Sequence, residues 1–175
     1  MYINQNRLNQ AIDKLENIKS TNTVPSWNQL PAIDLYMDQV IILLNQYVNT
    51  NTPITQSMIN NYVKLKAIPA PVKKRYSKIH LAYLIIFCTL KQTLSISTIQ
   101  KIMPVDLTEQ QVIKVYNSFI DNRQKALKYA LEKVREISTN EEIDNVIMQI
   151  SNIANVFKKL TEDITFEEQT EKNKA

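Results

Sequence analysis

The sequence contains no glycine among its 175 residues. Glycine adopts a left-handed backbone at little cost, so tight hairpins, phosphate-binding loops and nucleophile elbows normally depend on it. Its absence excludes the Walker, dinucleotide-binding and G-x-S-x-G motifs, each of which needs glycine for close approach of the backbone to a ligand or a turn. Such a chain is expected to favour helices over strands, and we predict an all-α fold.

Apolar residues recur at helical spacing through most of the chain. The segments predicted to form helices are 4–19, 32–48, 56–66, 78–92, 95–103, 108–138 and a last helix that begins near Asn140. We expect the helix over 32–48 to be mostly buried. Thr55 and Ser77 are predicted N-caps, because a hydroxyl there can accept an unpaired backbone N–H.

These elements divide the chain into four predicted segments. Residues 1–22 are an N-terminal amphipathic helix, and residues 25–105 form the unit that holds the basic stretch described next. Residues 106–164 contain two long helices joined by a short turn, which predicts a helical hairpin. Residues 165–175 are expected to be a frayed polar tail.

Basic residues are concentrated in the middle of the chain. Residues 39–105 contain eight Lys or Arg and no Asp or Glu, whereas the segments on either side carry net charges of −1 and −3. This asymmetry is typical of a surface that faces nucleic acid or an acidic membrane. A solvated face without a polyanionic partner is the alternative, and the charge run alone does not separate the two.

Cysteine and histidine are too scarce for a zinc site. Cys88, the only cysteine, lies in an apolar run and is expected to be a core thiol. His80, the only histidine, is interpreted as a hydrogen-bonded packing residue or a phosphate contact rather than a catalytic base. We therefore expect no metal and no other cofactor.

The N-terminus is polar and lacks the hydrophobic stretch of a signal peptide. The longest apolar run is about half as long as a membrane-spanning helix. We therefore expect a cytoplasmic protein with no membrane partner.

The predicted helix over 56–66 carries polar and apolar residues on opposite arcs. Its predicted base-reading residues are Ser57, Asn60, Asn61 and Lys64. The DNA major groove admits an α-helix, in which asparagine can pair with adenine edges while serine and lysine contact bases or phosphates. An ordinary exposed face is the alternative for a polar arc taken alone. The basic run over 73–75 follows directly, and phosphate contacts there would position such a helix, so the two features support each other.

The stretch MINNYVKLKAIPAPVKKRYSKIHLAYLIIFCTLKQTLSISTIQKIM resembles the MerR-type winged helix-turn-helix. The similar features are a recognition helix ending in a tyrosine and an I-x-x-P exit, a basic wing, R-Y-S, a buried helix and S-I-x-x-I. The region of about 25–135 is also similar to a family of uncharacterised proteins from low-GC Gram-positive bacteria that are regarded as MerR-like regulators.

This resemblance implies roles for individual residues. Tyr62 stands at the second tyrosine of the MerR R-Y-Y pattern, and Lys66 replaces a usual glycine. Tyr76 matches the wing tyrosine, and the glycine-bearing hairpin of the wing is shortened to VKKR (72–75), so we expect a reduced wing that is only a basic loop. The predicted phosphate-binding residues are Thr55, Lys66, Lys73, Lys74, Arg75, Tyr76 and Lys78.

The resemblance also implies a homodimer, because MerR relatives pair through a C-terminal helix. Apolar surface for this contact is expected on residues 108–162, from Val112, Phe119, Ile150 and Phe157. Packing of these helices back onto the rest of the chain is the alternative. We carry over no effector site, because the chain has neither the cysteines nor a clear aromatic pocket for one.

Together these patterns predict a sequence-specific regulator of transcription that binds double-stranded DNA as a dimer and represses by occlusion. The alternative is a non-enzymatic helical interaction module whose basic surface binds an acidic protein partner or an anionic surface. An enzyme is a third hypothesis, which we set aside because no nucleophile, carboxylate pair or metal set converges at a readable spacing.

Overall fold

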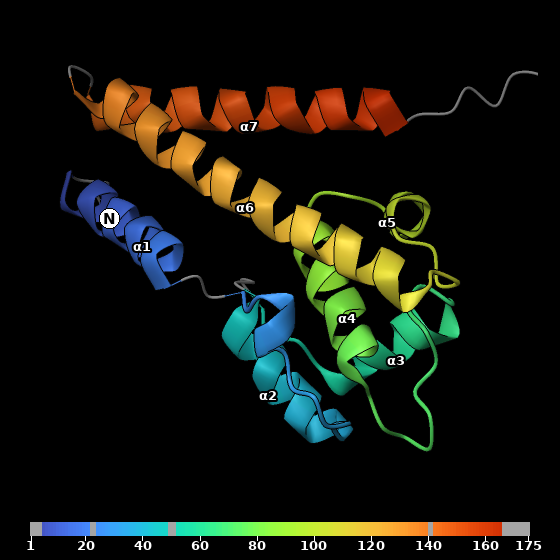
Figure 1. The fold of residues 1–175 in the computed structure, drawn as a ribbon. Coiled ribbons are helices and arrows are strands. Elements are labelled where there is room, and N and C mark those ends of the chain that lie inside the picture. The colour runs from blue at the N-terminus through green and yellow to red at the C-terminus, as the bar shows by residue number, and fades with distance from the viewer. Residues whose placement is uncertain (1–4, 22–23, 49–51, 140–141, 166–175) are drawn as a thin grey trace, which may run out of the picture.

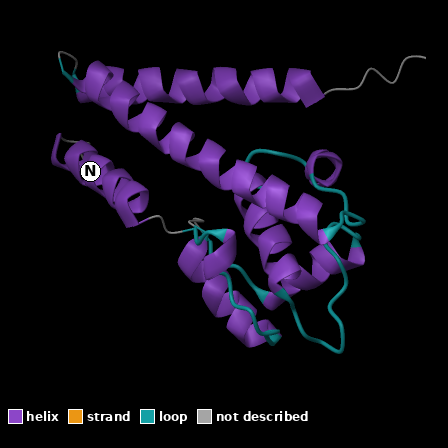
Figure 2. Cartoon of the chain, in the orientation of Figure 1, coloured by secondary structure: helices purple, strands orange, loops and turns teal. Residues whose placement is uncertain are grey.

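The computed structural model describes residues 5–21, 24–48, 52–139 and 142–165 (Figure 1). Over these residues it contains seven α-helices, one short 3₁₀ helix and two isolated β-bridges, with no strand (Figure 2). The prediction of an all-α fold is confirmed. The elements are α1 (Gln5–Thr21), η1 (Trp27–Gln29), α2 (Met37–Tyr47), α3 (Gln56–Lys64), α4 (Lys78–Leu90), α5 (Ile96–Ile102), α6 (Glu109–Ser138) and α7 (Ile143–Thr165).

Helix α4 is the centre of the main core, the cluster of buried residues that runs from Val24 to Tyr116. All nine residues from His80 to Cys88 are buried, because α2, α3 and α6 surround this helix (Figure 1). Burial of an aliphatic or aromatic side chain stabilises a fold by about 1.5–3 kcal/mol. Cys88 is a buried free thiol, as predicted, and burial raises its pKa to about 12.

Hydroxyl caps begin several helices. The Thr55 hydroxyl accepts the Met58 N–H at 3.4 Å, which confirms the predicted cap of α3. Ser77 is the N-cap of α4, as predicted, and its own N–H donates to Nδ1 of His80 at 3.0 Å. Nδ1 is therefore the unprotonated nitrogen, and Nε2–H donates to the Ala70 carbonyl at 3.1 Å. His80 is thus a hydrogen-bonded packing residue that holds the entrance to α4.

Helix α2 begins at Met37, five residues later than predicted. The preceding Leu35 exchanges two backbone hydrogen bonds with Tyr76, at 2.9 and 2.8 Å, and this bridge holds Leu35 in an extended conformation. The expectation that the helix is mostly buried is wrong for one face. Val40 and Leu44 are buried, but Ile42 is 67% exposed, because α2 packs against α3 and α4 on one side only.

A second, smaller core lies at the far end of α6. It is formed by Leu8 of α1, Ile137 of α6 and Val146 of α7, with further apolar residues of the same helices packed around them. An ion pair between Glu16 and Arg135 also joins α1 to α6. The N-terminal helix therefore packs against the C-terminal helices rather than against the basic unit (Figure 1).

Helices α6 and α7 meet at their turn and diverge away from it (Figure 1). The apolar residues predicted to offer a dimer surface are mostly used within the chain. Val112 is buried in the main core, Phe119 packs against that core, and Ile150 packs in the second one. Phe157 is 51% exposed, and its ring lies edge-on to the Tyr129 ring of α6 with 6.3 Å between centroids. The predicted helix start at Asn140 and nearly all of the predicted tail lie outside the described residues.

Within the described ranges, none of the helices combines the length and the apolar character needed to cross a membrane.

Two buried tyrosines predict a loss of stability at alkaline pH. Tyr83 donates its hydroxyl to the Pro104 carbonyl at 2.5 Å, and Tyr116 donates to the Pro25 carbonyl at 2.9 Å. Burial, with a smaller contribution from Asp106, raises the pKa of Tyr83 to about 12, and burial also raises the pKa of Tyr116. In an unfolded chain tyrosine ionises near pH 10. Their contribution to stability is therefore complete below about pH 10 and is lost as the pH rises towards 12.

We expect cooperative loss of circular dichroism at 222 nm between about pH 10 and 12. Absorbance at 295 nm should show exposed tyrosines ionising near pH 10 and buried ones ionising only with unfolding. Tyr129→Phe, which changes an exposed tyrosine, should leave the unfolding midpoint in place. Ionisation of every tyrosine near pH 10 with helicity retained would contradict this prediction.

Candidate nucleic-acid interface

Helix α3 separates its apolar and polar residues as predicted. Ile59 and Tyr62 are buried, and the Tyr62 ring packs on the Phe87 ring with 5.4 Å between centroids. The four predicted base-reading residues, Ser57, Asn60, Asn61 and Lys64, are all exposed. Leu65 departs from the prediction, since it is the C-cap of the helix and is 47% exposed, unlike the buried residues of the apolar arc. The helix is thus anchored on α4 and presents its amide-rich face to solvent.

The C-terminal end of α3 is closed by a residue in the left-handed conformation. Lys66 has a φ of 51°, its N–H donates to the Val63 carbonyl at 3.0 Å, and the Ala67 N–H donates to the Tyr62 carbonyl at 2.9 Å. This pair of bonds is the Schellman motif, in which glycine is the usual left-handed residue. Lysine at this position costs roughly 1–2 kcal/mol.

Gln100 of α5 also holds this end of α3. Its Nε2 donates to the carbonyls of Leu65 and Lys66, at 3.3 and 3.1 Å. This contact is not predictable from the sequence, because a single glutamine on a short helix carries no local signal of a partner 34 residues away.

The VKKR segment forms a hairpin, which we call the basic hairpin (residues 72–75). The Val72 N–H donates to the Arg75 carbonyl at 3.2 Å, and the Arg75 N–H donates to the Val72 carbonyl at 2.9 Å. Lys73 and Lys74 have φ values of 50° and 63°, the signs that a type I′ turn requires. The expectations that this segment is only a loop, and that a chain without glycine avoids tight hairpins, are wrong here. The adjacent Leu35–Tyr76 bridge fixes the base of the turn and imposes this geometry.

Tyr36 fixes the last residue of the basic hairpin. Nη2 of Arg75 donates to the Tyr36 hydroxyl at 2.9 Å, and the guanidinium lies 4.9 Å from the centroid of the same ring. Arg75 is exposed. The same pairing places the exposed carboxylate-bearing residue Asp34, next to Leu35, near the base of the hairpin, although the acid-free stretch begins only after it in the sequence.

Three predicted phosphate-binding residues have other contacts in the structure. Tyr76 is a correction, because it is 2% exposed and packs edge-on against the His80 ring in the main core, so its side chain does not reach a phosphate. Lys78 is half-buried, with its ammonium 4.9 Å from the Trp27 ring centroid. Thr55 is exposed, but its hydroxyl oxygen accepts the cap bond of α3.

The structure therefore presents two groups of exposed residues that belong to consecutive elements. One is the amide-rich face of α3, and the other is the cationic group of Lys66, Lys73, Lys74 and Arg75. The loop with the basic hairpin projects from the helical body between α3 and α4 (Figure 1). In the described part of the chain, no three His, Cys, Asp or Glu side chains gather as a metal site would require. These residues can bind an anion through the cationic group and can form hydrogen bonds with a polar partner through the amide-rich face.

The chain belongs to the family described as Domain of unknown function (DUF1836), whose model matches residues 25–119. This match nearly coincides with the main core, which runs from Val24 to Tyr116. The family domain is therefore the unit built around α4, which includes α3 and the basic hairpin. Helix α1, the distal part of α6 and α7 lie outside the match. No curated protein and no solved structure matches the chain.

Relief of the left-handed backbone should stabilise the protein. Replacing Lys73 by Asn and Lys74 by Gly installs the residues that a type I′ turn favours, so the free energy of unfolding is expected to rise by roughly 1–2 kcal/mol. Urea denaturation followed by circular dichroism measures this change.

The control is Lys73→Gln with Lys74→Gln, which removes the same charges and keeps both β-carbons. We expect little change in stability from that pair. Equal stabilisation by both pairs would assign the effect to charge repulsion and not to the backbone.

Proposed function

We propose that this DUF1836 protein is a sequence-specific regulator of transcription that binds double-stranded DNA and catalyses no reaction. In this proposal α3 lies in the major groove and reads base edges with Ser57, Asn60, Asn61 and Lys64. The cationic group, formed by Lys66, Lys73, Lys74 and Arg75, contacts phosphates on either side of it. Repression by occlusion of a promoter is the simplest outcome of such binding.

The observation that carries the proposal is the identity of the residues at positive φ. Among the non-glycine residues of the described chain, Lys66, Lys73 and Lys74 have positive φ, and all three are exposed. Asparagine is common in this sequence and tolerates the left-handed region better than lysine does, yet it stands at none of the three positions. Lysine stands at these sites despite its cost in folding free energy, and a polyanionic partner would account for the positive charge there.

The dimensions of α3 support its place in the groove. An α-helix with its side chains is about 10–12 Å across, which fits a major groove about 12 Å wide, and the nine residues of α3 give it a length of about 14 Å. Asn60 and Asn61 are adjacent on the exposed face, and each amide can pair with an adenine edge. Burial of Tyr62 against Phe87 holds that face in a fixed orientation, so base contacts need little ordering of the helix.

The order of elements agrees with the MerR resemblance. A helix (α2), a second helix with an exposed polar face (α3), a two-residue hairpin and a buried helix (α4) follow one another within residues 37–90. Lys66, which replaces the usual glycine of that pattern, adopts the left-handed conformation for which glycine is suited. In this proposal the short basic hairpin corresponds to the wing.

We further propose that the protein is a homodimer through α7. A row of apolar residues spaced alternately three and four apart follows one side of this helix: Ile143, Val146, Ile150, Ile153, Phe157, Leu160 and Ile164. The first four pack within the second core, whereas Phe157, Leu160 and Ile164 are 51%, 51% and 74% exposed. Such a spacing is that of a helix pair, so the uncovered half suits the same half of a second copy.

Binding to DNA should depend on the basic hairpin. Lys73→Gln with Lys74→Gln is expected to weaken binding to all DNA sequences and to reduce the slope of log affinity against log salt by about 2, since two phosphate contacts are lost. Fluorescence anisotropy on labelled duplexes at several salt concentrations measures both effects. Lys158→Gln with Lys159→Gln on α7 removes the same charge and should change neither.

The preferred sequence is found by selection from random duplexes. Asn60→Ala should then lower the affinity for that sequence by about 1–3 kcal/mol and leave non-specific binding almost unchanged. If no sequence preference emerges while the hairpin variant still weakens binding to polyanions, the interaction module with an acidic partner is the better hypothesis. Wild-type binding by the hairpin variant would refute the phosphate contacts.

The oligomeric state tests the α7 contact. Leu160→Glu with Ile164→Glu places charges on the uncovered apolar residues and should convert a dimer to a monomer, as measured by light scattering after size exclusion. Ser151→Glu with Asn155→Glu changes exposed positions on the opposite side of the helix and should leave a dimer. A wild-type protein that is monomeric at tens of micromolar would contradict the dimer.

A further inference from the structure

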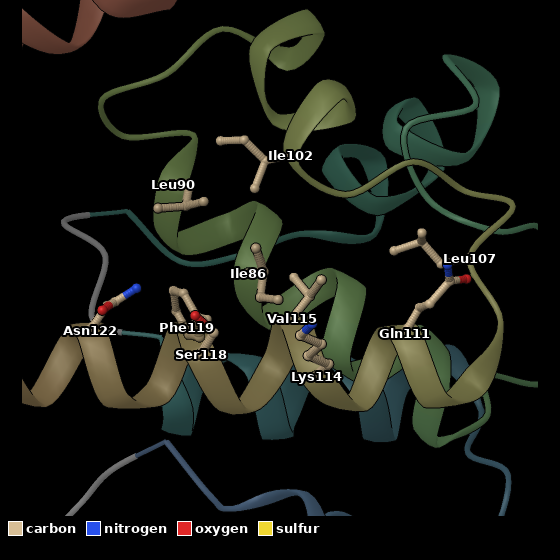
Figure 3. Close-up of a pocket in the computed structure, with 10 residues that line it drawn as sticks. All are labelled: Ile86, Leu90, Ile102, Leu107, Gln111, Lys114, Val115, Ser118, Phe119 and Asn122. Carbon is tan, nitrogen blue, oxygen red and sulfur yellow. The ribbon is translucent and has the colours of Figure 1, made fainter.

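A cavity of about 570 Å³ lies between α4, α5 and α6 (Figure 3). Its walls are apolar: Ile86 and Leu90 of α4 and Ile102 of α5 lie across from Val115 and Phe119 of α6. Ile102 remains 47% exposed, so part of this apolar wall is in contact with water. The volume is within the range of small-molecule binding sites, and a ligand here would remove apolar surface from water.

The polar edge of the cavity is supplied by α6. Its residues are Gln111, Lys114, Ser118 and Asn122. Lys114 is the one charged residue among those that line the cavity, and no carboxylate lines it. Gln111 uses its Oε1 to accept the Thr108 N–H at 2.8 Å, which leaves its NH₂ as a donor at the edge. An apolar interior beside one cation and several hydrogen-bond donors suits a ligand with an apolar body and one negative group.

We propose that this cavity binds a small amphipathic carboxylate, with the apolar body between α4, α5 and α6 and the carboxylate at Lys114. All of the lining residues except Asn122 lie inside the family match, and none belongs to the candidate DNA-binding surface.

The position of α5 connects the cavity to α3. Ile102 forms the cavity wall from α5, and Gln100 of the same short helix donates to the carbonyls of Leu65 and Lys66. A ligand that shifts α5 therefore shifts the end of α3 and the left-handed Lys66. If α3 binds DNA as proposed above, on which this step rests, the bound carboxylate would change the affinity for DNA and so act as an effector.

Binding is tested without DNA, so its outcome is independent of the proposed function. The probes are 4-phenylbutyrate and its neutral amide, titrated into the ¹⁵N-labelled full chain while amide chemical shifts are recorded. We expect saturable shifts at residues that line the cavity with both probes. Lys114→Met keeps the aliphatic stem and should weaken the carboxylate about three- to tenfold while leaving the amide unchanged.

Lys125→Met is the matched control, because it changes an exposed lysine three turns further along α6. It should bind both probes as the wild type does. The proposed site would be overturned if neither probe caused saturable shifts at millimolar concentration. It would also be overturned if Lys114→Met weakened the binding of both probes equally.

The connection to α3 is tested in the same titration. In the wild type the amide resonances of Leu65 and Lys66 should move with the same saturation as those of the cavity. Gln100→Leu should keep carboxylate binding and abolish at least half of the shift at these two amides. Unchanged chemical shifts at Leu65 and Lys66 in the saturated wild type would overturn the connection. Because the titration contains no DNA, a failure of the protein to bind DNA would leave both the cavity result and the α3 result intact.

Discussion

Burial of α4 on every side is the interaction on which the rest of the structure depends. Nine consecutive buried residues cannot be covered by one neighbouring helix, so α2, α3, α5 and α6 all contribute side chains to the same core. This arrangement leaves α3 with only one face to bury, and its amide-rich face remains in solvent. The family match covers this unit almost residue for residue, which indicates that the core around α4 is what the family shares.

The geometry of the candidate interface is set by contacts between residues that are far apart in the sequence. The Leu35–Tyr76 bridge and the Arg75–Tyr36 contact fix the basic hairpin, and Gln100 fixes the end of α3. These contacts stabilise three lysines in a backbone region that lysine disfavours. At these three positions lysine supplies positive charge to the surface but raises the free energy of the left-handed backbone. The hydrogen bonds around the hairpin and the end of α3 hold the backbone in that conformation.

Much of the helical pattern was predictable because it depends on local spacing. The buried side of α3, the thiol at Cys88 and the cap at Thr55 follow from apolar periodicity and from the chemistry of a single hydroxyl. The start of α2 was not predictable in this way, since Leu35 is held by a residue 41 positions later. Packing of α1 on the distal end of α6 was missed for the same reason, because its apolar stripe does not specify which helix covers it.

The sequence by itself determined the all-α fold, the amphipathic α3 and the concentration of basic charge, because each of these depends on the identity and spacing of neighbouring residues. Only the tertiary structure decided that Tyr76 and Lys78 are drawn into packing, that Lys66, Lys73 and Lys74 adopt positive φ, and that Phe157, Leu160 and Ile164 stay at least half exposed. These outcomes depend on which distant segments meet, and hydrogen bonds and apolar contacts between such segments outweigh local preferences of about 1 kcal/mol per residue.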